Sequence, residues 1–130
     1  MAEGWWSLMS ALRSYRDLEV WRRSIDLAEA IYRASSAWPA DERFGLSSQI
    51  RRAAVSVPAN VAEGAARRGT GEFLQFLGVA KGSLAELETH LILAERLEYL
   101  AVQENEKLLA LAAEIGRMLS GLTRSLRSKT

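Results

Sequence analysis

Residues 49–64 read QIRRAAVSVPANVAEG, and the pattern of this stretch predicts a helix. At about 100° per residue, the turn angle of an α-helix, its side chains and their neighbours separate into two stripes. One stripe is apolar and consists of Leu46, Ile50, Ala54, Val57 and Val61. The other is polar and consists of Arg52, Ser56, Asn60, Glu63 and Arg67. The apolar stripe requires a core, and the polar stripe requires water, a partner chain or a matching polar helix.

Pro58 lies inside this predicted helix. Because proline has no N–H, the carbonyl of Ala54 loses its donor and the chain is expected to bend, at roughly 3 kcal/mol in an unsupported helix. Ser56 and Asn60 can supply hydrogen bonds to the strained turn. Two interpretations stay open. The segment is either a bent core helix with local repair, or part of a polar seam at a subunit or ligand interface.

Apolar residues at three- and four-residue spacing predict helices on both sides of this one. We expect helices from about residue 17 to the Trp38-Pro39 pair, from 42 to 66, from 71 to 97 and from 103 to 126. Asp41 and Thr70 are expected to cap the second and third. The apolar stripe of the first helix consists of Leu18, Trp21, Ile25, Ala28 and Tyr32, with Leu27 and Ile31 beside it. That of the fourth consists of Leu108, Leu111, Ile115, Met118, Leu122 and Leu126.

Four long helices with short links predict an all-α protein, an antiparallel up-down-up-down bundle whose second helix is kinked at Pro58. We expect a single bundle domain over residues 17–126. Residues 1–16, which include Trp5 and Trp6, precede it as an arm or a tail, and residues 127–130 form a basic end.

The third predicted helix has the clearest apolar stripe, from Phe73 to Ala94, with polar residues beside it. Gly78 and Gly82 are poor helix formers, and their spacing suggests close approach by another helix. The expected polar seam, either structural or at an interface, consists of Arg52, Ser56, Asn60, Glu63, Ser83 and Glu86.

Composition excludes several classes of site. A chain of 130 residues with 48% hydrophobic residues fits one domain with a core. The chain contains no cysteine and only one histidine, His90, so disulfides, thiol chemistry and a multi-histidine metal site within one chain are excluded. No apolar run is long enough to span a bilayer, and the first residues make a poor secretory signal. We therefore expect a cytoplasmic protein with no cofactor and no membrane contact.

Catalytic groupings are not convincing in this sequence. Glu63 and Glu86 are candidates for a carboxylate pair. Salt bridges of Glu63 with Arg67 and of Glu86 with Arg52 are the simpler interpretation, and the first pair has the i, i+4 spacing of helical partners. His90 lacks the Glu-x-x-His spacing of bundle di-metal sites. The sequence therefore predicts that the protein is not an enzyme.

Charge is unevenly distributed although the formal net charge is only +1. Acidic residues dominate from Glu86 to Glu106. Basic residues dominate from Arg43 to Arg68 and from Arg117 to the end of the chain. Such polarity suits contact with nucleic acid, or contact between identical subunits. The candidate residues for RNA or DNA binding are Arg51, Arg52, Arg67, Arg68, Lys81, Arg117, Arg124 and Arg127.

Several segments together resemble the bacterial 23S rRNA intervening-sequence protein family. They are residues 17–21 (DLEVW), Trp38-Pro39, residues 45–54 (GLSSQIRRAA), residues 56–64 (SVPANVAEG), Phe73-Leu74 and residues 80–89 (AKGSLAELET). The resemblance covers about residues 17–126. It implies a four-helix protomer that assembles into a ring-like homopentamer, and a more distant similarity to accessory proteins of diversity-generating retroelements.

Two functions follow as hypotheses from the charge pattern and this resemblance. The first is a non-enzymatic homo-oligomer, pentameric by resemblance, that contacts RNA or DNA through basic surface patches. The second is a protein-binding adaptor or accessory subunit, for example of a reverse transcriptase or in ribosome-related assembly. The near-neutral net charge departs from the strongly basic pattern of the retroelement proteins.

Overall fold

The computed structural model describes residues 14–128 of the chain. The expected arm at residues 1–16 therefore lies largely outside the described residues, and the basic end lies partly outside them. In chain order the elements are the 3₁₀ turn η1 (Tyr15–Asp17), helix α2 (Glu19–Ser35), the 3₁₀ turn η2 (Ala40–Glu42), and helices α3 (Leu46–Ala66), α4 (Thr70–Arg96) and α5 (Val102–Ser128).

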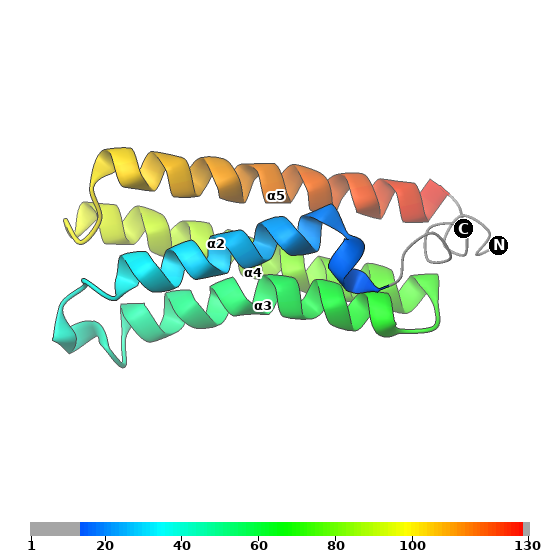
Figure 1. Ribbon diagram of the computed structural model, residues 1–130, viewed down its shortest axis with the longest axis horizontal. Coiled ribbons are helices and arrows are strands. Elements are labelled where there is room, and N and C mark those ends of the chain that lie inside the picture. The colour runs from blue at the N-terminus through cyan, green and yellow to red at the C-terminus, as the bar shows by residue number, and fades with distance from the viewer. Residues whose placement is uncertain (1–13, 129–130) are drawn as a thin grey trace.

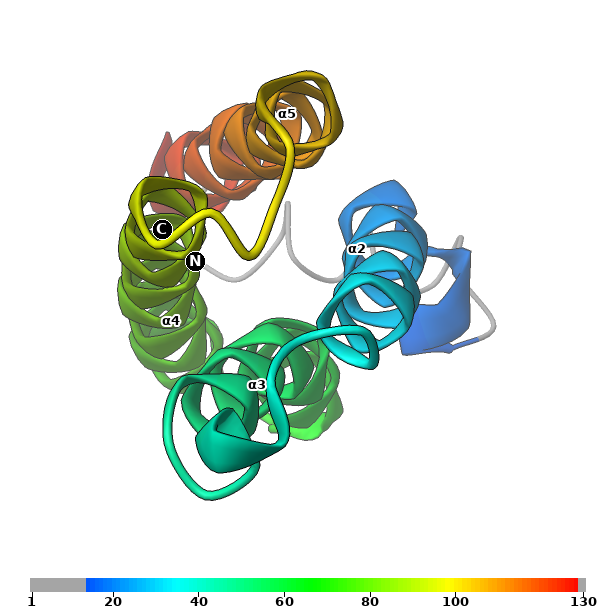
Figure 2. The same ribbon diagram turned by 90° about the vertical axis from the view of Figure 1, so that its left-hand side faces the viewer.

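The four α-helices of the described residues run side by side and alternate in direction (Figure 1). Each helix packs against the next one in the chain, and α2 also packs against α5, which closes the arrangement (Figure 2). The expectation of an all-α four-helix protein is confirmed. Pro58 lies within α3, and the helix continues on both sides of it. A bend at Pro58 stays a prediction.

The core follows the expected stripes most closely in α3 and α4. All five apolar residues expected to face inward from α3 are buried, Ile50 and Val61 completely. In α4, every residue of the expected stripe is buried except Phe76, which is half-buried. These two helices share the most extensive contact in the bundle. Their apolar stripes are clear because both belong to this one large interface.

The expected inward face of α2 was partly wrong. Ile25 and Tyr32 are 39% and 44% exposed, whereas the buried positions of α2 are Val20, Ser24, Leu27, Ala28, Ile31 and Ser35. Ser24 and Ser35 can be buried because their hydroxyls donate to the carbonyls of Val20 and Ile31, one turn earlier (2.7 Å each). Because serine is polar, a pattern of hydrophobic residues does not mark these two positions of α2 as buried.

The inward face of α5 is also shifted by one residue in its middle. Ala112 and Leu119 are fully buried, whereas Leu111, Met118 and Leu122 are only half-buried. Alanine is only weakly hydrophobic, so the prediction favoured the larger neighbouring side chains over Ala112. The expected residues and the buried residues belong to one broad apolar face of α5. The structure shows that Ala112 and Leu119 lie at the centre of that face and that Leu111, Met118 and Leu122 lie toward its edge.

Both expected helix caps were wrong. Asp41 lies within η2, and α3 begins four residues after η2, with Gly45 as its N-cap. The carboxylate of Glu42 performs the capping role instead, because its Oε1 accepts the N–H of Leu46 (3.0 Å). Thr70 is the first residue of α4, its N-cap is Gly69, and its buried hydroxyl has no hydrogen-bond partner in the described residues.

Candidate nucleic-acid interface

A groove of about 510 Å³ lies between α4 and α5. Lys81 from α4 and Arg117 and Arg124 from α5 line it, and Glu88 is its one acidic lining residue among the described side chains. Small residues of both helices, Ala85, Ala112, Ala113 and Gly116, also line it. The structure thus brings together three of the basic candidates from two helices, with an excess of positive charge.

A second hollow, of about 880 Å³, lies between the end of α2, residues 36–45 and the first half of α3. Arg51 and Arg52 both line it, together with Arg43. Arg51 is held in place: its Nε donates to Ser35 Oγ (2.8 Å), its Nη2 donates to the carbonyl of Tyr32 (3.2 Å), and its guanidinium lies 4.7 Å from the centre of the Tyr32 ring. We call this hollow the α2–α3 pocket.

The remaining basic candidates lie apart from these two places. Arg67 binds Glu63 (2.8 Å), approaches Glu72 (3.9 Å) and stacks on Phe76. Its charge is therefore already matched by carboxylates. Arg68 is exposed in the turn between α3 and α4, and Arg127 is exposed near the end of α5.

The polar seam is a contact between α3 and α4 within one protomer. The hydroxyls of Ser56 and Ser83 lie 2.8 Å apart, and the Asn60 amide donates to the carbonyl (2.8 Å) and the hydroxyl (2.9 Å) of Ser56. These three residues are half-buried. They satisfy one another at the turn next to Pro58, and none of these bonds reaches the carbonyl of Ala54, so local repair of that carbonyl stays a prediction. Contact of the seam with another subunit stays a prediction.

The charged residues of the seam point to different partners. Glu63 pairs with Arg67, as the i, i+4 spacing predicted. Glu86 lies 3.3 Å from His90 Nε2 on its own helix, in place of the expected pair with Arg52. The described contacts hold no salt bridge of Arg52. Arg52 is exposed beside the α2–α3 pocket.

The outward side of α4 and its C-terminal end expose four large apolar side chains among polar ones. Val79, Ile92, Leu93 and Leu97 are each 44–49% exposed. The close helix approach expected at Gly78 and Gly82 does not occur within the protomer, because a Cβ added at either glycine would meet no atom within 4 Å. Both glycines are instead open on this outward face.

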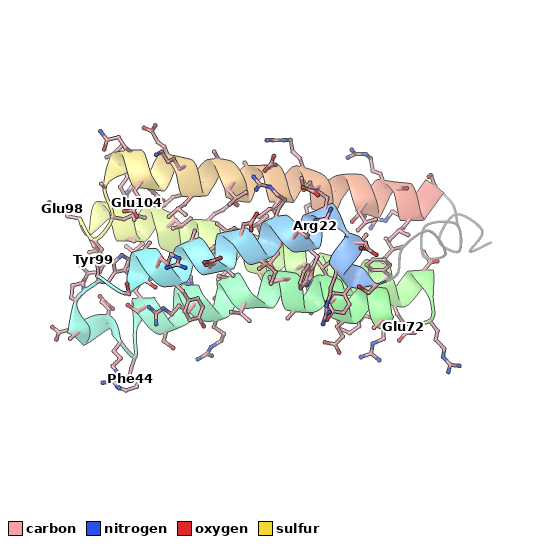
Figure 3. All side chains as sticks on the ribbon, in the orientation of Figure 1. Arg22, Phe44, Glu72, Glu98, Tyr99 and Glu104 are labelled. Carbon is pink, nitrogen blue, oxygen red and sulfur yellow. The ribbon has the colours of Figure 1, made fainter. Side chains whose placement is uncertain are left out.

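Residues 36–45 are anchored to the α4–α5 turn at one end of the bundle. Glu42 Oε2 accepts the hydroxyl of Tyr99 (2.8 Å), and the Tyr99 ring lies against Trp38 (5.9 Å between centroids). In Figure 3, Phe44 and Tyr99 lie at this same end. The N–H of Leu46, followed by the Tyr99 hydroxyl, lowers the pKa of Glu42, and the Glu42 carboxylate raises the pKa of Tyr99.

This anchor predicts a contribution of Glu42 to acid stability. A carboxyl whose pKa is lowered by folding stabilises the protein fully above its unfolded pKa of about 4.3, and the stabilisation is lost as pH falls through the folded pKa. Glu42→Gln is therefore expected to show a smaller loss of stability than the original chain when urea unfolding is compared at about pH 6 and about pH 3. Glu104→Gln, which removes an exposed carboxylate, serves as the control. An unchanged acid dependence in Glu42→Gln would contradict the anchor.

Two residues that shape the α2–α3 pocket were not among the candidates from sequence. Arg43 lies in the linker, and Trp38 is buried there with its indole N–H lacking an acceptor in the described residues. The closeness of Arg43, Arg51 and Arg52 in the sequence was a signal that could have indicated this pocket. Their convergence depends on how residues 36–45 fold back, and no local periodicity predicts that path.

Within residues 14–128, no helix is long and apolar enough to cross a bilayer, and no three histidine or carboxylate side chains gather as metal ligands would.

The family of the chain follows from a comparison with protein-family models. Residues 16–121 match the model of the 23S rRNA-intervening sequence protein, which covers nearly all of the bundle. The chain belongs to this family. The resemblance inferred from segments such as residues 45–54 is therefore confirmed.

A solved structure supports the fold of this 23S rRNA-intervening sequence protein family member. The chain is similar to a protein of unknown function from the S23 ribosomal protein family of Bacteroides thetaiotaomicron. The two are 26% identical with a TM-score of 0.73, and the match covers 80% of this chain and 97% of the other. No curated protein matches the chain. Neither the family description nor that of the solved structure names a catalytic activity.

Proposed function

We propose that this protein is a non-enzymatic homo-oligomer that contacts RNA or DNA through the groove between α4 and α5. The observation that carries the proposal is the convergence of Lys81, Arg117 and Arg124 from two helices on one groove. Arg117 and Arg124 lie seven residues apart, or about 10 Å along the helix, so they present a row of charge and not a single point. Basic side chains arranged in this way suit a phosphate backbone.

The geometry favours backbone contact over reading of bases. The described side chains that line the groove include no aromatic ring, so bases have no stacking platform of the kind found in single-strand-binding proteins. Phosphate contacts position a nucleic acid without distinguishing its sequence. We therefore expect binding that depends strongly on salt and weakly on sequence.

The outward face of α4 supports assembly. Ile92, Leu93 and Leu97 expose apolar side chains at the end of α4, and Val79 exposes one nearer its start. Large apolar side chains left exposed in a protomer are available to a second copy of the chain. Gly78 and Gly82 leave room there for a second helix to approach closely. In an oligomer the α4–α5 groove is repeated on each subunit, so weak individual grooves combine by multivalency. The number five rests on the family resemblance alone.

The groove predicts the salt dependence of binding. Replacing Lys81, Arg117 and Arg124 together with glutamine is expected to weaken binding to a mixed-sequence single-stranded RNA. The plot of log affinity against log salt concentration should become shallower by about 2 for each groove engaged, since each phosphate contact contributes roughly 0.7. Fluorescence anisotropy at several salt concentrations measures both quantities, and light scattering gives the mass of the assembly.

A matched control separates this groove from total charge. Replacing Arg33, Arg96 and Lys107 with glutamine changes the formal net charge by the same three units, from +1 to −2, at exposed positions outside the groove. This control is expected to keep most of the affinity. Equal losses in the two triple variants, or no salt-sensitive binding by the original chain, would reject the nucleic-acid proposal. The mass of a single protomer would reject the assembly.

We propose protein binding as the second candidate function, because Phe44 is 87% exposed in the linker before α3. An exposed phenylalanine is a suitable anchor for a partner protein. In this role the protein would be an adaptor or accessory subunit, for example of a reverse transcriptase or in ribosome-related assembly. Recovery of a partner after nuclease treatment by the original chain, and its loss in Phe44→Ala, would favour this role over the first.

A further inference from the structure

The α2–α3 pocket has the side-chain chemistry of an anion site. Three arginines line it, and its other polar lining groups are hydroxyls, including those of Ser35, Ser36, Ser47, Ser48 and Ser56. No described carboxylate lines the pocket. Glu42 is close in sequence, but its two carboxylate oxygens are engaged by the Leu46 N–H and the Tyr99 hydroxyl. The lining itself therefore carries three positive charges and no negative charge, and the ionised carboxylate of Glu42 lies next to it in the linker.

Arg51 is oriented before any ligand arrives. Its guanidinium is fixed by Ser35 Oγ, by the carbonyl of Tyr32 and by the Tyr32 ring. These contacts use only part of its five N–H groups. A side chain that is already ordered loses less entropy when it binds a ligand, so Arg51 provides a rigid charge beside the more exposed Arg52.

The start of α3 favours negative charge at the same place, and a buried unpaired donor belongs to the same lining. The first turn of α3, which includes Ser47 and Ser48, lines the pocket, and Glu42 caps the N–H of Leu46 in that turn. The N-terminus of a 21-residue helix attracts anions. In addition, Trp38 lines the pocket and its buried indole N–H lacks an acceptor among the described residues. Such a donor is costly to leave unpaired.

We propose that the α2–α3 pocket binds the phosphate monoester of a small molecule of about nucleotide size. A phosphate monoester carries about −1.5 to −2 charge near neutral pH and offers several acceptor oxygens, which match arginine guanidinium groups. The pocket volume of about 880 Å³ lies within the usual range of small-molecule sites, about 300–1,000 Å³.

This site is separate from the proposed nucleic-acid groove. The α2–α3 pair and the α4–α5 pair occupy opposite sides of the bundle (Figure 2), and the two hollows share no lining residue. Binding in the pocket therefore does not depend on the function proposed for the groove, and either proposal can fail alone.

Isothermal titration of the full chain with adenosine 5′-monophosphate, inorganic phosphate and adenosine tests the pocket. We expect the monophosphate to bind once per protomer with a dissociation constant of about 1 mM or tighter. Inorganic phosphate should compete with it, and adenosine should not bind. Arg52→Gln is expected to weaken monophosphate binding about tenfold, the effect of losing one charge-assisted hydrogen bond. Arg52→Lys, which keeps the charge, should lose less.

Arg96→Gln is the matched control, because Arg96 is exposed on α4 and lines neither hollow. It should bind the monophosphate like the original chain. Thermal unfolding of each variant establishes that Arg52→Gln is folded, which is expected because Arg52 is exposed. The proposal is overturned if the monophosphate does not bind, if adenosine binds equally well, or if Arg96→Gln weakens binding as much as Arg52→Gln.

Discussion

Replacing Phe73 with alanine is expected to lower the free energy of unfolding by about 3–5 kcal/mol, the usual range for a buried phenylalanine. Phe73 has no exposed surface and belongs to the first turns of α4, where α4 packs against the end of α3. Removing its ring leaves a cavity that the two helices can close only by shifting toward each other. Urea unfolding at a fixed protein concentration measures the loss, since assembly would make stability depend on concentration.

Phe44→Ala is the matched control for this prediction. The same side chain is removed, but Phe44 is 87% exposed and projects from the linker at the end of the bundle (Figure 3). Its free energy of unfolding should change by no more than about 0.5 kcal/mol, as is usual for surface positions. If both alanine variants lost similar stability, the core assigned to α3 and α4 would be incorrect.

Replacing Gly64 with alanine is expected to destabilise the protein although alanine is the better helix former. A Cβ at this buried position would lie 2.8 Å from the Cβ of Phe76 and 3.0 Å from Cδ1 of Phe73. It would also lie 3.3 Å from the Phe73 carbonyl oxygen. Because a backbone atom and a Cβ cannot rotate away, the helices must separate. Such overpacking costs about 1–3 kcal/mol.

Gly78→Ala provides the opposite expectation on the neighbouring helix. Within the protomer, no atom lies within 4 Å of a Cβ added at this exposed position. At a protein concentration too low for assembly, the helix preference for alanine therefore stabilises the protomer by up to about 1 kcal/mol. Urea unfolding of both variants should therefore give changes of opposite sign. A Gly64→Ala variant as stable as Gly78→Ala would show that α3 and α4 are not in close contact at this point.

The bundle itself was predictable because amphipathic helices repeat their signal every few residues. The five apolar residues chosen from α3 are all buried, and the end of α3 at Ala66 was predicted correctly. The errors arose where the signal depended on side chains other than large apolar ones. Ser24 and Ser35 are buried in α2 through hydrogen bonds to its own backbone, and Ala112 is buried in α5 although its side chain is a single methyl group.

The candidate sites were less predictable than the helices. Basic residues could be counted from the sequence, but their grouping could not. Lys81 and Arg117 meet because α4 and α5 lie next to each other, and Arg43 joins Arg51 and Arg52 because the linker folds back over the start of α3. Arg67, in contrast, is matched by Glu63 and Glu72, and is therefore a weaker candidate for phosphate contact.

The sequence alone determined that this chain is an all-α four-helix protein of its family. Helical periodicity and family segments are patterns of residues close together in the chain, so they can be recognised without a structure. Only the tertiary structure decided which face of α2 is buried, that Glu42 caps α3, and that the basic residues form two hollows on opposite sides of the bundle. The physical reason is that each of these features requires side chains far apart in sequence to meet, and helix pairing and the path of the linker determine those distances.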